Sequence, residues 1–413
     1  MMSSDSVGSR AFYTARGVFD GLGSGLRLGE GVLVEGGRVV AVGRAGDVAM
    51  GGAQTYDLGD AVIVPGFVDA HTHVTIRPGE GDQHGQLVRP AVWQTIRGVE
   101  NVHRMLQSGV TTARIMTEQY DIDFEFRDAV SRGEVAGPRL LVAGPGLSPP
   151  GGHGSSGGGV AGVGPLREAV RDRAAKGADH IKIFTTGGVS SVGSTLKESN
   201  YSGEEIAAIV DEARMAGLQV SAHAHGGPGV DLAVENGIRS IEHGAMLDEG
   251  NIERMVKYGT WLTLTNSISF HPDGIERGDA RIPQIMAKVL ETREYVKQNV
   301  ARIREAKIPL ALGTDSMHGY FGFEIQWMVD HGWTAEQAMK SATSGGAGLI
   351  GDPDIGVLRP GSRADFVVLG GDPFQDIAAV YAVRAVYRAG SEVVDGAGTV
   401  RPFVDPEYRA TKE

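Results

Sequence analysis

Apolar and polar residues follow two different rhythms along the chain. Residues 11–60 hold short valine-rich runs, such as 31–34 and 38–42, separated by glycines, and residues 364–394 return to the same pattern. Runs of this kind predict small hairpins. From residue 61 onward, apolar segments of strand length alternate with segments whose apolar residues recur at helical spacing. The middle of the chain is therefore expected to alternate between strands and helices.

Eight strands are expected in this middle region. They are predicted at residues 62–68, 111–116, 139–143, 180–184, 219–225, 240–244, 260–266 and 309–315. The helices between them include residues 91–107, 166–176, 203–216, 228–235 and 282–305. This alternation is typical of an α/β fold of the (β/α)8 TIM-barrel type, which needs roughly 250 residues.

The chain of 413 residues leaves room for a second, smaller unit beside a barrel. We expect residues 62–346 to form the barrel, and residues 1–61 and 347–413 to form one composite β-sandwich domain built from both chain ends. In such a barrel, the side chains that carry chemistry gather at the carboxyl ends of the strands. The search for a site therefore starts there.

Composition narrows the partners and the kind of site. The net charge of -12 argues against nucleic acid and against an anionic membrane surface, because both need a basic face. The chain has no cysteine, so a metal would be held by histidine and carboxylate. Residues 1–20 lack the apolar core of a signal peptide, and no apolar stretch reaches the roughly 18 residues of a membrane-spanning helix. We expect a cytoplasmic homo-oligomer that acts on a small-molecule substrate.

Two histidines, His71 and His73, follow the first predicted barrel strand. Side chains alternate along a strand, so residues two apart lie on one face. Two neutral imidazoles on one face can hold a metal ion, although solvated or core histidines can have the same spacing. The other strand ends decide between these interpretations.

Three further strand ends carry imidazoles or a carboxylate. The fifth strand ends in His223 and His225, the sixth in His243 and the eighth in Asp315. Each of these residues alone is more often structural than functional. Together with the first pair they are hard to obtain by chance, and they indicate a metal site.

Lys182 stands between two isoleucines in the fourth strand, so it faces the barrel interior if the isoleucines face the helices. A buried lysine is rare without a partner, because burial disfavours the ammonium form. A neutral lysine can add carbon dioxide, and the resulting carbamate can bridge two metal ions. The alternative is a lysine whose ammonium group reaches the barrel rim and pairs with an acid.

These positions together resemble the amidohydrolase superfamily. The resemblance covers the whole chain: the first histidine pair follows a Pro-Gly-Phe-Val-Asp-Ala strand, and residues 361–369 with Gly371-Asp372-Pro373 are similar to the family's usual return strand. Four motifs are similar to its Xaa-Pro dipeptidase and imidazolonepropionase-like branch: Ile181-Lys182-Ile183, Gly187-Gly188-Val189, Ala222-His223-Ala224-His225-Gly226 and Ile241-Glu242-His243-Gly244.

The resemblance implies a binuclear centre with two divalent metal ions, for which zinc is the expected metal. His71, His73 and Asp315 would hold the more buried ion, and His223 and His243 the more exposed one. Carbon dioxide bound as a carbamate on Lys182 would bridge the two. A hydroxide held between the ions would attack the substrate carbonyl, and Asp315 would pass its proton to the leaving nitrogen.

Polar residues of the loops are candidates for contact with the substrate. His153, in a glycine-rich loop, could donate to the oxyanion as a second catalytic residue, or it could be a solvated loop histidine. His225 could contact the substrate or orient a metal ligand. Candidates for binding a substrate carboxylate, each of which could also be a solvated surface residue, are Tyr201, Arg77, His84 and Arg89, and a further pocket candidate is His318.

The expected reaction is hydrolysis of an amide bond in a dipeptide or an N-acyl amino acid. The same centre could hydrolyse a carbamate, urea, ester or lactone, because the carbonyl chemistry is shared. Deamination is the weaker hypothesis. Mononuclear deaminases of the superfamily carry a glutamate where Gly226 and Gly227 stand here, and they lack the bridging lysine. An inactive scaffold conflicts with the presence of every expected ligand.

Overall fold

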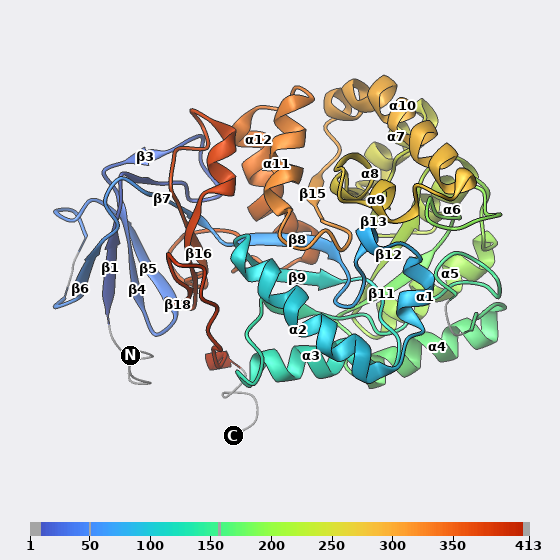
Figure 1. The fold of residues 1–413 in the computed structure, drawn as a ribbon, viewed down its shortest axis with the longest axis horizontal. Helices are drawn as coiled ribbons and strands as arrows, with labels where there is room; N and C mark the ends of the chain where they lie inside the picture. The colour runs from blue at the N-terminus through green and yellow to red at the C-terminus, as the bar shows by residue number, and fades with distance from the viewer. Residues whose placement is uncertain (1–9, 49–50, 156–157, 408–413) are drawn as a thin grey trace.

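The computed structural model describes residues 10–48, 51–155 and 158–407. Figure 1 shows two parts side by side. Strands from both ends of the chain, among them β1, β4, β16 and β18, lie at the left of the view. A larger part, in which strands alternate with helices, lies at the right.

In the part of the chain that the structure describes, strands near the two ends form two sheets. One has the strand order β5-β4-β1-β6, and the other has the order β18-β17-β16-β7-β2-β3. The second sheet combines both ends because β16 pairs antiparallel with β7. The strands are β1 (Ala11–Thr14), β2 (Gly17–Val18), β3 (Arg27–Leu28), β4 (Gly31–Glu35), β5 (Arg38–Gly43), β6 (Gln54–Asp57), β7 (Val62–Pro65), β16 (Phe366–Leu369), β17 (Val383–Arg388) and β18 (Ser391–Val394).

Aromatic side chains join these two sheets. Tyr13 of β1 stacks on Tyr56 of β6, with the ring centroids 5.2 Å apart. The same tyrosine meets the rings of Phe366 and Tyr387 from the other sheet edge-on, each at 5.1 Å. Valines of both sheets are buried in the same cluster. The apolar faces expected from the valine-rich runs therefore pack against each other.

Within the described residues, eight parallel strands form the second part of the fold. They are β8 (Phe67–Thr72), β9 (Val110–Ile115), β10 (Arg139–Leu141), β11 (His180–Phe184), β12 (Gln219–Ala224), β13 (Ser240–His243), β14 (Trp261–Leu264) and β15 (Leu310–Leu312). Their orders are β10-β9-β8 and β11-β12-β13-β14-β15. A parallel bridge joins Leu147, after β10, to Ile183 of β11. The N–H of Asp315, after β15, donates to the carbonyl of His71 in β8 at 2.9 Å.

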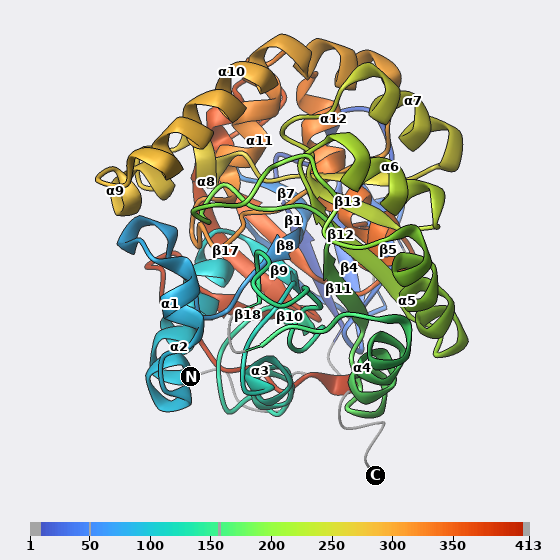
Figure 2. The ribbon, with the colours of Figure 1, turned by 90° about the vertical axis from the view of Figure 1, so that its right-hand side faces the viewer.

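Helices surround the parallel strands (Figure 2), so this part has an α/β fold of TIM-barrel type. The helices are α1 (Gln83–Leu87), α2 (Ala91–Gln107), α3 (Ile122–Ser131), α4 (Val163–Ala175), α5 (Gly203–Met215), α6 (Gly227–Glu235), α7 (Glu249–Tyr258), α8 (Ser267–Phe270), α9 (Ile275–Asp279), α10 (Pro283–Ala306), α11 (Phe321–Asp330), α12 (Ala335–Lys340) and α13 (Gly346–Ile350). Short 3-10 helices span Pro78–Glu80 and Ile377–Tyr381, and a π-helical turn spans Ser341–Gly345.

The strand expected at residues 62–68 is two strands in the structure. β7 pairs with β16 and β2 in the terminal sheet, whereas β8 pairs with β9 among the parallel strands. The chain changes sheets at Gly66, where a Cβ atom would lie 2.0 Å from Oγ1 of Thr111. Only glycine allows this approach, and a continuous apolar run hides the change of partner. By contrast, β11 and α2 have the predicted bounds.

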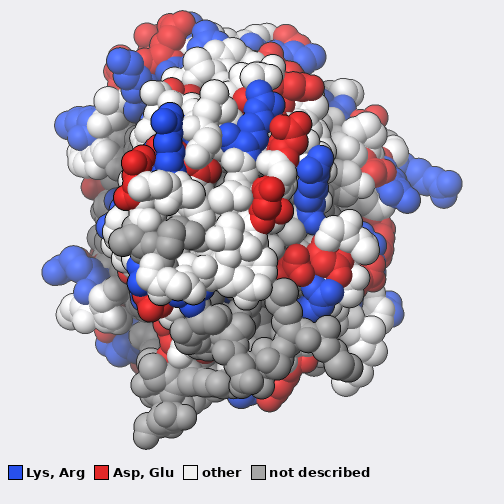
Figure 3. Space-filling view, turned by 90° about the vertical axis from the view of Figure 1, so that its left-hand side faces the viewer, with Lys and Arg blue, Asp and Glu red and all other residues white. Residues whose placement is uncertain are grey.

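The surface of the terminal sheets carries no continuous basic band among the described residues. Lysine and arginine side chains are interspersed with aspartate and glutamate over this face (Figure 3). No helix in the described part of the chain is long and apolar enough to cross a membrane.

Asp405 anchors the C-terminal segment through a buried ion-pair cluster. Its Oδ2 lies 3.1 Å from Arg139 and 3.0 Å from Arg388. Asp365 is the second carboxylate of the cluster, 2.8 Å from Arg139. Burial, and then the neighbouring charge of Arg139, lower the pKa of Arg388 to about 10. The cluster therefore depends on both carboxylates.

Asp405→Asn is expected to lower the free energy of unfolding by about 3–5 kcal/mol, because it leaves the guanidinium groups of buried Arg388 and partly buried Arg139 with one carboxylate. Urea titration measures this loss. Asp211→Asn is the control, since it removes an exposed partner of Arg167 and Arg214 and should cost less than about 1 kcal/mol. Equal losses for the two variants would show that the buried cluster contributes no more to the free energy of unfolding than an exposed ion pair does.

Candidate metal centre

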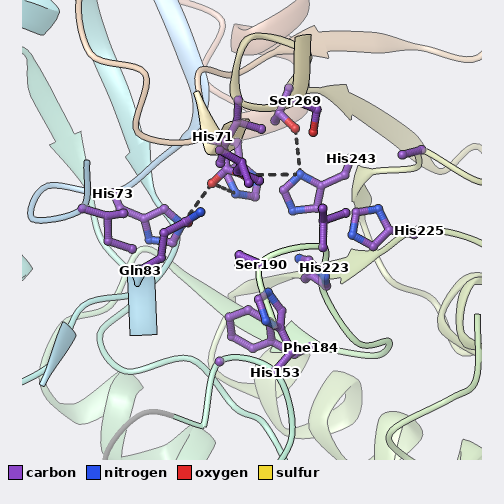
Figure 4. Close-up of a pocket in the computed structure, with 18 of the residues that line it drawn as sticks. His71, His73, Gln83, His153, Phe184, Ser190, His223, His225, His243 and Ser269 are labelled. Atoms are coloured by element: carbon purple, nitrogen blue, oxygen red, sulfur yellow. Dashed lines mark hydrogen bonds and ion pairs between the residues drawn. The ribbon is translucent and has the colours of Figure 1, made fainter. Parts of the chain in front are cut away.

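Side chains from the carboxyl ends of the parallel strands converge on one cavity (Figure 4). The six ligands expected from the sequence all line it: His71 and His73 from the end of β8, Lys182 from β11, His223 from β12, His243 from the end of β13 and Asp315 from the loop after β15.

Asp315 lies at the middle of this group. Its Oδ1 is 3.5 Å from Nε2 of His71 and 3.4 Å from Nε2 of His73, and its Oδ2 is 3.7 Å from Nδ1 of His243. Burial opposes ionisation of Asp315, but the neighbouring imidazoles of His71 and His73 outweigh it and hold the pKa well below its usual range. The carboxylate is therefore ionised at neutral pH.

Hydrogen bonds to the protein fix the orientation of the first imidazole. His71 donates its Nδ1–H to Glu242 at 2.8 Å, which leaves Nε2 facing Asp315. Glu242 is fully buried and also accepts a hydrogen bond from Arg114 at 2.7 Å. Burial opposes ionisation of Glu242, but Arg114 and His71 hold its pKa well below the usual range. A buried carboxylate behind a histidine is the usual support of a metal-binding imidazole.

Two other imidazoles are oriented by backbone carbonyls. His73 donates its Nδ1–H to the carbonyl of Thr117 at 2.9 Å, and His223 donates its Nε2–H to the carbonyl of Gly187 at 3.2 Å. Each ring therefore has one nitrogen engaged with the protein and one that can bind a metal.

The turns after β13 and β15 have unusual backbone angles. His243 has φ 74° and Asp315 has φ 45°, in the left-handed region that side-chain-bearing residues rarely adopt. Thr314, just before Asp315, is fixed by Asp69, which accepts hydrogen bonds from its N–H at 3.0 Å and its hydroxyl at 2.6 Å. This strained backbone turns both side chains into the cavity.

The donor set fits a divalent metal ion. The ligand atoms of His71, His243 and Asp315 all lie within 4.8 Å of one another. Imidazole and carboxylate without thiolate are the donors that zinc and similar ions accept. Burial lowers the pKa values of His223 and His243 well below the usual range, which keeps both rings in the neutral, ligating form.

Lys182 lies in the same cavity without an ion pair to a carboxylate in the described part of the chain. Its side chain is fully buried, flanked along β11 by buried Ile181 and Ile183. Burial lowers the pKa of Lys182 to about 8, although the charges of Glu242 and Asp315 oppose this. The amine is therefore neutral more often than an exposed lysine is.

Ser191 brings two of the predicted loop histidines together at the cavity. Its Oγ lies 2.6 Å from Nδ1 of His153 and 2.7 Å from Nε2 of His84. His153 also packs on His223, with the ring centroids 4.5 Å apart. A Cβ atom at Gly188 would lie 2.3 Å from the His153 ring, which explains a glycine in the loop after β11.

His225 lines the cavity beside the ligands. Its ring centroid is 4.9 Å from that of His223 and 5.3 Å from that of His243. Both of its ring nitrogens are buried, and neither has a hydrogen-bond partner among the described residues. They are therefore free to contact a bound molecule.

The structure places Tyr201 and His318 outside the cavity. The Tyr201 hydroxyl donates to the carbonyl of Val160 at 2.8 Å. His318 donates its Nε2–H to the carbonyl of His73 at 2.6 Å, from the far side of that ligand. Their polar atoms are thus used to hold the backbone around the site.

The two arginines predicted to bind a carboxylate also lie outside the cavity. Arg77 donates to Asn101 at 2.8 Å and pairs with Glu100 at 2.7 Å. Arg89 is exposed, with its guanidinium 4.7 Å from the centre of the Trp93 ring. Neither arginine is among the residues that line the cavity with the predicted ligands.

The sequence reasoning did not single out three residues that support the site: Glu242, Arg114 and Ser191. Glu242 directly precedes His243, and strict alternation along a strand places the two on opposite faces. The left-handed backbone at His243 defeats that rule, since both side chains serve the site. The signal that was available is a charged pair, Arg114 and Glu242, in two strands that hold no other lysine, arginine, aspartate or glutamate.

Comparisons with known proteins agree with this geometry. A model of the amidohydrolase family matches residues 62–393. Ochratoxinase of Aspergillus niger is 29% identical over 374 residues, which cover 82% of this chain and 76% of that protein.

Solved structures give the same result. A prolidase complexed with N-methylphosphonate-L-proline is similar with a TM-score of 0.86 and 29% identity, over 93% of this chain and 99% of that one. A Xaa-Pro dipeptidase with methionine bound in its active site has a TM-score of 0.85 and 27% identity, over the same shares. The matched residues 62–393 include every strand end that carries a candidate ligand, and the chain therefore belongs to the amidohydrolase family, as a hydrolase that acts on carbon–nitrogen bonds.

Proposed function

We propose that this hydrolase holds two divalent metal ions in the cavity and cleaves an amide bond of a small molecule. The observation that carries the proposal is the convergence of His71, His243 and Asp315 within 4.8 Å, beside the buried amine of Lys182. The family is generally metal-dependent, which agrees with this donor set.

The ligands would divide between two sites. His71, His73 and Asp315 would hold one ion, and His223 and His243 the other. Lys182, as a carbamate formed with carbon dioxide, would bridge them, because burial favours the neutral amine that this reaction needs. Zinc is the metal that imidazole and oxygen donors of this kind suit.

Ions bound there would lower the pKa of water to roughly 7 and polarise the scissile carbonyl. The chain's own residues would move the protons. Asp315, kept ionised by His71 and His73, would accept a proton from the attacking water and return it to the leaving nitrogen. His153 would donate from Nε2 to the carbonyl oxygen as negative charge develops there, since its Nδ1 is engaged by Ser191.

A dipeptide or an N-acyl amino acid is the proposed substrate class, supported by the similarity to a prolidase and a Xaa-Pro dipeptidase. The second candidate is a carbamate, urea, ester or lactone, and the apolar residues on one wall of the cavity favour it. His84, His153 and His225 are the proposed substrate contacts, because these three of the predicted loop residues line the cavity.

A hydrolysis panel tests the proposal. It comprises Xaa-Pro and Xaa-Arg dipeptides, aromatic N-acyl amino acids and acylated amines, carbamates and lactones, each offered to enzyme purified without chelator. We expect hydrolysis of at least one amide, loss of that activity on removal of the metal, and recovery when zinc is added. Undiminished turnover by protein shown to be free of metal would overturn the metal-dependent mechanism.

Ser191→Ala is expected to lower kcat about tenfold or more, because it removes the hydrogen bond that holds the His153 ring. The effect on KM should be smaller, since the residue does not touch the substrate itself. Ser191→Thr keeps the hydroxyl and should recover most of the rate. Loss of activity in both variants, with an unchanged melting temperature, would mean that the hydroxyl does not act through His153.

We also propose that the two parallel sheets form one closed barrel. The support is the Leu147 to Ile183 bridge on one side and the hydrogen bond from Asp315 to His71 on the other. The two terminal sheets, joined by Tyr13, Phe366 and Tyr387, would form a sandwich domain from both chain ends.

A further inference from the structure

The walls of the cavity are uncharged apart from the metal centre itself. The described residues that line it include one lysine, Lys182, one carboxylate, Asp315, and no arginine. The remaining lining residues are histidines, neutral polar residues and apolar residues. A substrate with a free carboxylate would therefore meet no arginine on the described part of these walls, and no lysine other than Lys182 among the predicted metal ligands.

The cations near the cavity are already engaged elsewhere. Lys288 donates to the backbone carbonyl of Ser191 at 2.7 Å and makes two further hydrogen bonds in the same loop. Arg293 donates to the carbonyl of Ser269 at 2.6 Å and pairs with Glu276 at 2.8 Å. Each of these groups would have to give up existing hydrogen bonds in order to receive a substrate anion.

One wall of the cavity is apolar. It is formed by Ile268 and Phe270 of α8, Ile275 of α9 and Val296 of α10, with Val189 from the loop after β11. Ile268, Ile275 and Val296 are almost fully buried. Contact with this wall would remove water from a charged group and return no opposite charge, whereas an apolar group gains from the same contact.

Two neutral amide groups in the lining have unused hydrogen-bonding atoms. The Nε2 of Gln83 and the Nδ2 of Asn266 are buried and have no partner among the described residues. Gln83 and His73 both line the cavity (Figure 4). An amide nitrogen without a partner can donate a hydrogen bond to a neutral acceptor on the substrate, such as a carbonyl or ether oxygen. If the amide group is rotated by 180°, its oxygen takes the same place and can accept a hydrogen bond instead.

From these observations we infer that the natural substrate is an uncharged acylated amine with a bulky apolar group, and that a free carboxylate next to the scissile bond is rejected. The apolar group lies against Ile268, Phe270 and Val296, and Gln83 and Asn266 bind uncharged polar atoms of the substrate. The inference rests on the proposed amide hydrolysis. It keeps amide hydrolysis but replaces the dipeptide and N-acyl amino acid class proposed above, because those compounds carry a carboxylate for which the described residues of the walls offer no arginine and no lysine other than Lys182.

A matched pair of substrates tests the inference: N-acyl-L-phenylalanine and N-acyl-2-phenylethylamine, which differ only in the carboxylate. Both carry the acyl group of the amide that the enzyme hydrolyses fastest in the panel. The rate of release of the free amine is measured with the zinc-loaded enzyme. We expect kcat/KM to be at least about tenfold higher for the phenylethylamine derivative. Equal values, or a preference for the carboxylate, would overturn the inference and leave amide hydrolysis intact. Hydrolysis of no amide in the panel would remove the proposed function itself.

Substitutions at Gln83 give a second test that does not depend on substrate shape. Gln83→Arg places a cation in the wall and should shift the preference toward the carboxylate substrate by about tenfold. Gln83→Met keeps the length without the charge and should not shift it in that direction. Gln298→Arg adds the same charge at an exposed position of α10 and is the control. An unchanged preference in a folded Gln83→Arg protein would contradict selection by the charge of the walls.

Discussion

Lys182→Ala should abolish hydrolysis and reduce the metal content of the purified protein. The reason is that the buried amine lies among the predicted ligands and has no carboxylate partner in the described part of the chain, so a carbamate bridge accounts for its position. Without the bridge, two cations would share a cavity in which Asp315 is the one lining carboxylate among the described residues. Turnover and elemental analysis on the same sample measure the two losses.

Chemical rescue distinguishes the bridge from a general structural effect. Formate, acetate or propionate can occupy the space left by the lysine and supply two oxygens, so each should restore part of the activity of Lys182→Ala. Lys176→Ala removes an exposed lysine that pairs with Asp121 and Asp172, and it should leave turnover and metal content unchanged. Wild-type turnover by Lys182→Ala would mean that the lysine serves as a rim cation.

Asp315→Asn should reduce kcat by about 10²–10⁴-fold, the usual range for loss of a general acid–base group. The substitution keeps the size of the side chain but removes the charge that lies between His71 and His73. Because the residue would also hold a metal ion, turnover is measured with excess zinc, and bound metal is measured separately.

The control for Asp315→Asn is Asp273→Asn, which alters a partly exposed carboxylate paired with Arg277 and Tyr320. It should leave kcat unchanged. A large fall in kcat for Asp315→Asn at full metal occupancy supports proton transfer, whereas a fall that excess zinc reverses would assign Asp315 to metal binding alone.

The fold was predictable where the local pattern of apolar residues alone sets the bounds of a strand or helix. β11 and α2 have the bounds that the apolar pattern predicts, and the ligands His71, His223 and Asp315 were placed at strand ends that do line one cavity. These positions follow from rules of alternation and barrel topology, which act over a few residues. They require no knowledge of long-range contacts.

Features that depend on distant contacts were not predictable in this way. Gly66 divides an apolar run between two sheets because Thr111, far along the chain, leaves no room for a side chain. Arg77 is of the residue type that binds carboxylates, but its guanidinium group already pairs with Glu100 and donates to Asn101. Ser191 has no local signal for its place between two histidines, because the loops that carry them meet only in the folded chain.

Metal content is the most direct measurement of the central claim. The protein is purified without chelator, its divalent metals are counted by elemental analysis, and electron density around Lys182 is examined in a crystal of the same preparation. We expect about two ions per chain and extra density on the Lys182 amine. Fewer than about one ion per chain, with an unmodified Lys182, would contradict the binuclear centre.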